Sequence, residues 1–188
     1  MRYRGIAVCA GVVLNRSFRL APLPEFDYDL RAETSADLAQ QAYRNASSSL
    51  ENEFRLNGAQ TGESTYADLI EVQLAMLNDE SFVELIEAGI AAGYAPEAAV
   101  LRAAKSFEQM LSALDDEYMA ARADDVRDLG VRLACRITNR TYPSLSELTE
   151  DCIVVARDML PSMLITAKRT HIRGLVTENG TRTSHISI

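Results

Sequence analysis

The hydrophobic positions between residues 32 and 139 recur at three- and four-residue spacing, which is the pattern of helices with one buried face. Glycines are few in this region, and Pro96 is its one proline. Since glycine and proline are the residues that most often interrupt helices, their scarcity favours long helical segments. The pattern predicts helices over 34–57, 64–78, 80–92 and 96–139, with a break in the last one at Leu114-Asp115-Asp116.

Capping residues stand where these helices are predicted to begin and end. Ser, Thr and Asp side chains satisfy the first turn of a helix, glycine ends a helix in a positive-φ conformation, and proline fits a first turn. We therefore expect an entry through Thr34-Ser35-Ala36-Asp37, N-caps at Ser64 and Ser81, helix ends at Gly58, Gly62 and Gly93, and Pro96 in a first turn.

Three apolar segments outside this region are rich in β-branched residues and are bounded by polar or turn residues. They cover 5–14, 152–156 and 174–177, and we interpret them as buried strands. Residues 160–171 are predicted to form a helix between the last two strands, which would pair in parallel. The expected fold class is therefore α + α/β. A helical bundle, 32–139, is inserted into a small α/β domain built from 1–31 and 140–188.

Composition places the chain among globular proteins, because 47% of its 188 residues are hydrophobic and 24% are charged. The start of the chain lacks a convincing signal peptide, and no apolar run approaches the roughly 18 residues of a membrane-spanning helix. The three cysteines are widely spaced and are not paired with histidines, which argues against a disulfide framework and a zinc site. We expect a cytoplasmic protein without a metal site of its own.

The negative charge is concentrated in one part of the chain. Residues 63–128 hold 15 acidic and 4 basic residues, a net charge of −11, while the whole chain carries −8. Such a segment disfavours nucleic acid and anionic membranes as partners and attracts a basic protein.

The chain ends in a polar loop around a histidine, Asn179–His185, directly after the last predicted strand. Exposed amides of such a loop bind anions, and Arg182 could add a charged contact to phosphate. A neutral imidazole can attack phosphorus, so His185 is a candidate nucleophile. On these residues alone an ordinary capping histidine also remains open. His171, among basic neighbours, is interpreted as a surface histidine.

Four separated parts of the chain resemble enzyme I, the phosphoenolpyruvate-protein phosphotransferase of the bacterial sugar phosphotransferase system. Thr177–His185 resembles its Gly-Gly-x-Thr-Ser-His phosphohistidine signature. Pyruvate phosphate dikinase and phosphoenolpyruvate synthase have related loops. The inserted helices distinguish enzyme I from those relatives. Here Leu114–Tyr118 and Arg122–Gly130 look like its Asp-Glu-Tyr and Ala-x-Asp-Val-Arg-Asp helix, Gln73–Asp79 resembles its Met-Leu-x-Asp segment, and Gly5–Gly11 its opening strand.

The resemblance implies a swivelling phosphohistidine α/β domain whose helical insert binds the phosphocarrier protein HPr. His185 would take a phosphoryl group from phosphoenolpyruvate and pass it to HPr in sugar uptake. The phosphate loop would be Gly180, Arg182, Thr183 and Ser184, and the residues that dock HPr would be Glu71, Asp79, Glu80 and Glu84. The resemblance also implies Mg²⁺ and a dimer for the full-length enzyme.

Two positions depart from the family pattern. Thr181 stands where a second glycine is usual, and Leu164 where a threonine would hydrogen-bond the resting histidine. The family also continues into a barrel that binds phosphoenolpyruvate and Mg²⁺. We therefore expect the α/β domain here to be incomplete at its C-terminus, and the chain alone to be monomeric, to hold no metal and not to use phosphoenolpyruvate.

Two other functions are considered. The first is a non-catalytic acidic helical module that binds a basic partner such as HPr. The second is a fragment of a dikinase, which the Asp-Asp-Glu-Tyr helix at 115–118 disfavours.

Overall fold

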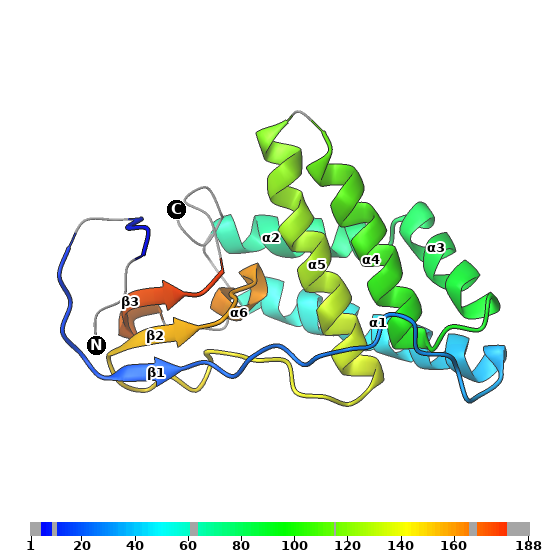
Figure 1. The fold of residues 1–188 in the computed structure, drawn as a ribbon, viewed down its shortest axis with the longest axis horizontal. Helices are drawn as coiled ribbons and strands as arrows, with labels where there is room; N and C mark the ends of the chain where they lie inside the picture. The colour runs from blue at the N-terminus through cyan, green and yellow to red at the C-terminus, as the bar shows by residue number, and fades with distance from the viewer. Residues whose placement is uncertain (1–4, 9–10, 61–63, 115, 166–168, 180–188) are drawn as a thin grey trace. The chain divides into compact units, whose positions relative to one another are not determined.

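The structure is a computed structural model that describes residues 5–8, 11–60, 64–114, 116–165 and 169–179 (Figure 1). The chain separates into two compact units. The helical unit comprises residues 24–142, and the α/β unit comprises residues 1–23 and 143–188. The helical unit thus begins at residue 24 rather than 32 and ends at 142 rather than 139.

The described residues of the helical unit form five helices, and the predicted combination of a helical bundle with a small parallel sheet is confirmed. The predicted break in the long last segment is also confirmed, because it separates two helices. The helices are α1 (Ala36–Gln60), α2 (Ser64–Leu77), α3 (Glu80–Ala91), α4 (Pro96–Ser112) and α5 (Glu117–Ile137). Each turns apolar residues inward, and the largest buried side chains include Leu50, Phe54, Leu77, Phe82, Ile86, Val100, Leu129 and Leu133.

The pair α4 and α5 makes the most extensive helix contact of this unit and lies side by side in Figure 1. Small residues allow the close approach, since a Cβ added to Gly130 would lie 2.5 Å from the Cβ of Ala104. Helix α3 packs on α4 in a similar way, with Gly89 facing Ala99. The Phe82 and Phe107 rings add an edge-to-face contact, with centroids 5.4 Å apart.

Side-chain caps begin three of these helices. Ser35 Oγ accepts a hydrogen bond from the Leu38 amide at 3.4 Å, which confirms the predicted entry into α1. Asp116 Oδ1 accepts one from the Met119 amide at 3.2 Å and begins α5. The predicted cap at Ser81 is wrong. Asp79 caps α3 instead, accepting from the Phe82 amide at 2.9 Å.

The predicted helix ends are confirmed at one glycine and wrong at another. Gly93 follows α3 with φ +87°, a conformation that favours glycine, and Pro96 lies in the first turn of α4. Helix α1 instead continues through Gly58 to Gln60, because a single glycine costs a helix only about 1 kcal/mol. Ser64 is the first residue of α2, and Gly62 lies outside the described residues.

Residues 24–31 belong to the helical unit because they are fastened to its helices. The Ala95 amide donates to the Leu30 carbonyl at 2.9 Å, next to an antiparallel bridge between Arg31 and Tyr94. Arg140 donates to the carbonyl of Glu25 at 2.7 Å. These contacts explain why the unit extends beyond the helices on both sides.

The α/β unit contains a three-stranded parallel sheet in the order β1 (Ser17–Arg19), β2 (Cys152–Ala156) and β3 (Ile172–Thr177). Buried residues alternate along β2, as expected for a strand with one covered face. The parallel pairing of β2 and β3 confirms the prediction. The connecting helix is shorter than 160–171, since α6 spans Pro161–Ile165 and a 3₁₀ turn follows at Arg169–His171.

The predicted strand over 5–14 is wrong for its described residues. They form no strand, and Ile6, Val12 and Leu14 are 73%, 99% and 97% exposed. A strand needs a hydrogen-bonding neighbour, and β2 is already paired on both sides, with β1 and β3. The described residues of this segment pair with neither of the two edge strands, β1 and β3, so its β-branched composition alone does not make it a strand.

Candidate functional site

In the sequence, the predicted phosphate loop comes directly after β3, which ends at Thr177. The chain continues alongside the residues after β2, because the Glu178 amide donates to the Ala156 carbonyl at 3.1 Å and the Asn179 amide to the Arg157 carbonyl at 2.9 Å. His185 itself and Gly180, Arg182, Thr183 and Ser184 lie outside the described residues, as do Thr181 and the side chain of Leu164. The carboxyl edge of a parallel sheet is where ligands commonly bind in α/β folds.

His171 lies at the opposite, amino edge of the sheet. Its Nδ1 is 3.1 Å from Asp151 Oδ1, and Arg173 Nε donates to Asp151 Oδ2 at 2.6 Å. The hydrogen bond from His171, followed by that from Arg173, lowers the pKa of Asp151. This cluster joins the residue before β2 to the start of β3, a structural role that agrees with the interpretation of His171 as a surface histidine.

The four predicted docking acids are exposed on the helical unit. Glu80 and Glu84 are one turn apart on α3, and Glu71 lies on α2. These three carboxylates form no ion pair with a residue that the structure describes. The carboxylate of Asp79 also has a structural role, because it caps the N-terminus of α3.

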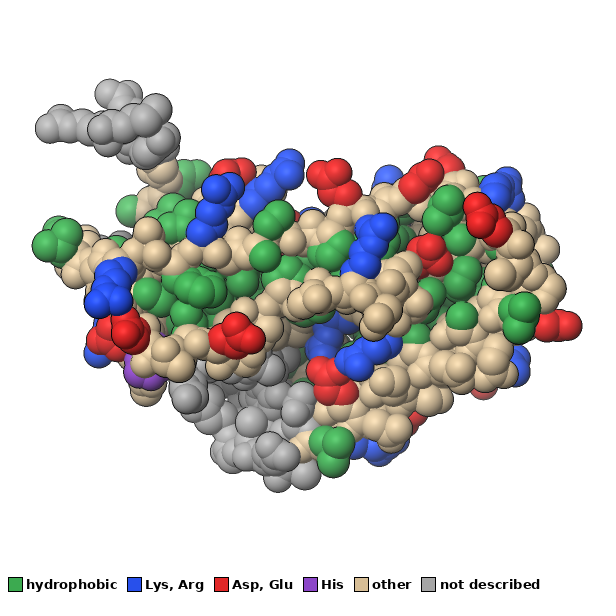
Figure 2. Space-filling model, turned by 90° about the horizontal axis from the view of Figure 1, so that it is seen from below, with side chains coloured by type: hydrophobic (Ala, Val, Ile, Leu, Met, Phe, Trp, Pro, Cys, Tyr) green, Lys and Arg blue, Asp and Glu red, His purple; other side chains and the backbone are tan. Residues whose placement is uncertain are grey.

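Acidic and basic side chains are intermixed on the face shown in Figure 2. No continuous acidic patch is visible on that face. The exposed acids of α2 and α3 are therefore the better candidates for a negatively charged docking surface.

A polar network inside the helical unit was not predicted. Gln73 of α2 and Asp125 and Asp128 of α5 are at most 1% exposed. Gln73 contacts Asp128 and Arg132, and Arg132 in turn contacts Glu53 of α1. The Asp-Val-Arg-Asp segment thus supplies buried acids to the core. A polar residue in register with Ile70 and Leu77 on one helix face is the signal that could have revealed this network.

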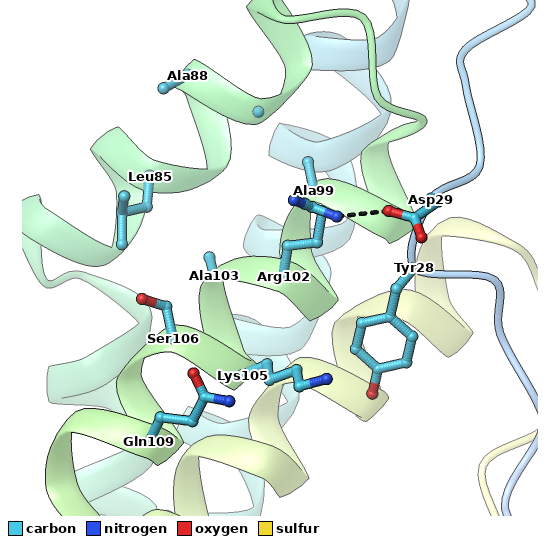
Figure 3. Close-up of a pocket in the computed structure, with 11 residues that line it drawn as sticks. Tyr28, Asp29, Leu85, Ala88, Ala99, Arg102, Ala103, Lys105, Ser106 and Gln109 are labelled. Carbon is cyan, nitrogen blue, oxygen red and sulfur yellow. Dashed lines mark hydrogen bonds and ion pairs between the residues drawn. The ribbon is translucent and has the colours of Figure 1, made fainter. Parts of the chain in front are cut away.

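The helical unit also carries an open groove of about 500 Å³ between α3, α4 and the segment before α1 (Figure 3). Arg102 extends across it to Asp29, with an ion pair of 2.6 Å, and Lys105 lies 5.5 Å from the Tyr28 ring. None of the four predicted docking acids lines this groove. The groove is therefore separate from the surface that the sequence indicates.

The part of the chain that the structure describes holds neither a metal-binding cluster nor a membrane-spanning helix. No three His, Cys, Asp or Glu side chains in that part of the chain are placed to hold a metal ion. Likewise, none of its helices is long and apolar enough to cross a membrane.

Comparison with known families decides the relationship. The model for the N-terminal part of PEP-utilising enzymes matches residues 4–122, and the model for their mobile domain matches residues 148–188. The chain belongs to the family of PEP-utilising enzymes. The second match includes the predicted phosphate loop and His185.

Curated relatives in this family are phosphoenolpyruvate-protein phosphotransferases. Those of Mycoplasma pneumoniae and Enterococcus faecalis are both 31% identical to the chain, over 192 and 189 residues, and that of Bacillus subtilis is 26% identical over 190 residues. Each alignment covers 98% of this chain and 33% of the relative. The chain thus spans about a third of the length of the curated relatives it matches.

Solved structures show the same fold. The solution structure of Enzyme I (nEIt) superimposes with a TM-score of 0.73 at 24% identity, covering 97% of this chain and 76% of that one. The N-terminal domain of Enzyme 1 - Nitrogen gives a TM-score of 0.65 at 23% identity, covering 96% and 75%.

Proposed function

We propose that this chain is the N-terminal part of a phosphoenolpyruvate-protein phosphotransferase, in which His185 carries a phosphoryl group from phosphoenolpyruvate to HPr. The match to the mobile domain across residues 148–188 carries this proposal, because it includes the histidine loop. The shared name of the curated relatives supports it. In the sequence this loop directly follows β3, and ligands commonly bind at the carboxyl edge of parallel sheets.

The chemistry assigned to this chain is reversible transfer through one nitrogen. A neutral imidazole nitrogen of His185 forms a bond to phosphorus as the bond between phosphorus and the enolpyruvate oxygen breaks. The second transfer breaks this N–P bond as a histidine of HPr attacks. Arg182 and the amides of Gly180, Thr183 and Ser184 are proposed to stabilise the charge on the phosphoryl oxygens. In this proposal the rest of the full-length enzyme supplies Mg²⁺, the phosphoenolpyruvate site and the dimer contacts.

The acids on α2 and α3 are proposed to attract HPr. Glu71, Glu80 and Glu84 are exposed and form no ion pairs with described residues, so they are available to a basic partner. Charges of this kind mainly raise the rate of association. We further propose that this transfer serves sugar uptake and takes place in the cytoplasm.

Mass spectrometry of the protein after incubation with phosphorylated HPr tests the transfer. An acid-labile phosphate is expected on the wild type and on His171→Ala, and no phosphate is expected on His185→Ala. Binding of phosphorylated HPr without any label would overturn the transfer and favour the non-catalytic acidic module.

A further inference from the structure

Helix α2 has a polar residue at the centre of its buried face. Ile70, Gln73 and Leu77 are 5%, 0% and 2% exposed and lie on one stripe of the helix. Buried glutamine is costly unless its amide is hydrogen-bonded. Ile70 and Leu77 alone would give α2 only a short apolar stripe, and apolar packing does not fix the rotation of a helix as hydrogen bonds do.

Both ends of the Gln73 amide meet α5. Nε2 donates to Asp128 Oδ2 at 3.3 Å, and Oε1 accepts from Arg132 Nη1 at 3.4 Å. Asp128 and Arg132 are one turn apart on α5. The amide therefore has one donor and one acceptor aligned along that helix, an arrangement that a rotated α2 would lose.

The two partners on α5 are themselves held in place. Tyr142 donates its hydroxyl to Asp128 Oδ1 at 2.8 Å. Arg132 donates to Glu53 Oε1 at 2.6 Å, and its guanidinium lies 4.5 Å from the Phe54 ring centre. Both Glu53 and Phe54 belong to α1. Gln73 is thus anchored to a fixed pair of groups rather than to flexible side chains.

Rotation of α2 would change what it presents to a partner. Glu71 lies two positions before Gln73, about 200° away around the helix, and it is exposed where Gln73 is buried. We propose that Gln73 is a positioning residue, whose buried amide fixes the rotation of α2 on α5 and so orients Glu71 towards HPr. The last step of this inference rests on the proposed function.

The test compares Gln73→Met with Gln40→Met in the full chain. Methionine keeps the size and apolar stem of glutamine but removes both hydrogen bonds. Gln40 is the control, since its amide also joins two helices, donating from α1 to Glu87 of α3 at 2.7 Å. Amide hydrogen exchange of α2 and α4 and the affinity for HPr are measured on each variant.

In Gln73→Met, exchange of the amides of residues 70–77 should rise about tenfold while α4 stays protected, because two directional contacts are lost. Affinity for HPr should fall about fivefold, and Glu71→Lys should then weaken binding less than it does in the wild type. Gln40→Met should change neither quantity. Unchanged exchange in α2, or raised exchange with wild-type affinity, would overturn the positioning role.

Tyr142→Phe provides a second variant in case Gln73→Met does not fold. It removes one hydroxyl from Asp128 and should raise α2 exchange by a smaller factor, about threefold, since one indirect contact is lost. No rise in α2 exchange in this variant would overturn the inference. Exchange is measured without HPr. If wild-type protein fails to bind HPr, the proposed docking fails, while the exchange data still decide whether Gln73 fixes α2.

Discussion

The carboxylates of the helical unit differ in how their charge is balanced. Glu53 accepts from both Arg132 and Arg136, so its part-buried charge has two opposite partners. Glu108, in α4, has no hydrogen bond or ion pair with a described residue. Burial raises its pKa, and the nearby charge of Asp124 acts in the same direction, while Arg127 and Lys105 oppose the shift.

This environment predicts that Glu108 destabilises the fold at neutral pH. Because its pKa is higher in the folded than in the unfolded state, the charged form is disfavoured by folding, and the penalty disappears below the unfolded value of about 4.5. Glu108→Gln should therefore raise the free energy of unfolding at pH 7, and the gain should vanish as the pH falls towards 4. Urea unfolding at several pH values measures it. A less stable variant at pH 7 would show that attraction to Arg127 outweighs burial.

At the scale of elements, the contact between α4 and α5 depends on the absence of one side chain. A Cβ at Gly130 would lie 2.5 Å from the Cβ of Ala104, much closer than two carbons approach. Gly130→Ala should therefore destabilise the protein by about 1–3 kcal/mol, although alanine favours helices more than glycine does. Urea unfolding gives the free energy.

Ala104→Gly makes the explanation for Gly130 testable. Alone, Ala104→Gly should lower the free energy of unfolding by about 1 kcal/mol, because glycine has a lower helix propensity than alanine. Combined with Gly130→Ala it should restore much of the lost stability, because the added methyl then occupies the space that was vacated. Simple additivity of the two costs would contradict the proposed clash. Gly174→Ala is a control, as its Cβ would meet Ile153 at an ordinary 3.6 Å.

The sequence predicts the helices well because their signals are local. Periodicity located all five, and the short acidic residues near 115–116 marked the break before α5. The errors occur where two local signals compete or where a distant partner decides. Asp79 competes with Ser81 for the cap of α3, and Gly58 is tolerated inside α1. The segment 5–14 has strand composition, but its described residues lack a neighbouring strand.

In the whole molecule, the candidate histidine loop can be proposed from the sequence, whereas the polar network inside the helical unit cannot. The loop around His185 is identified by consecutive residue types, which a sequence displays directly. Gln73, Asp128 and Glu53 come from three different helices, and only folding brings their side chains together. The motif at 125–128 pointed to the family, but its physical role as buried acids becomes evident only in the folded helical unit.

The exposed acids predict a salt-dependent encounter with HPr. Glu80→Lys combined with Glu84→Lys should slow association several-fold at low ionic strength and less at higher salt, since charges are screened beyond about 8 Å at ~0.15 M. Asp79 is left unchanged because it caps α3. Stopped-flow association measures the rate. Glu25→Lys with Glu33→Lys, an equal change of charge at exposed positions before α1, should have a smaller effect. Equal effects of the two pairs would exclude α3 from the docking surface.

The contacts within 24–142 predict that the helical unit folds by itself. Its two ends are fastened together, because Arg140 donates to the Glu25 carbonyl and its guanidinium lies 5.0 Å from the Phe26 ring centre. The core of Phe54, Phe82 and Leu133 lies inside the same range. Residues 24–142 alone should therefore show helical circular dichroism and one cooperative thermal transition. Arg140→Met should lower the midpoint by about 4 °C, the shift expected for a loss of about 1 kcal/mol in a domain of this size. A broad, non-cooperative melt of the isolated unit would show that its core requires residues of the α/β unit.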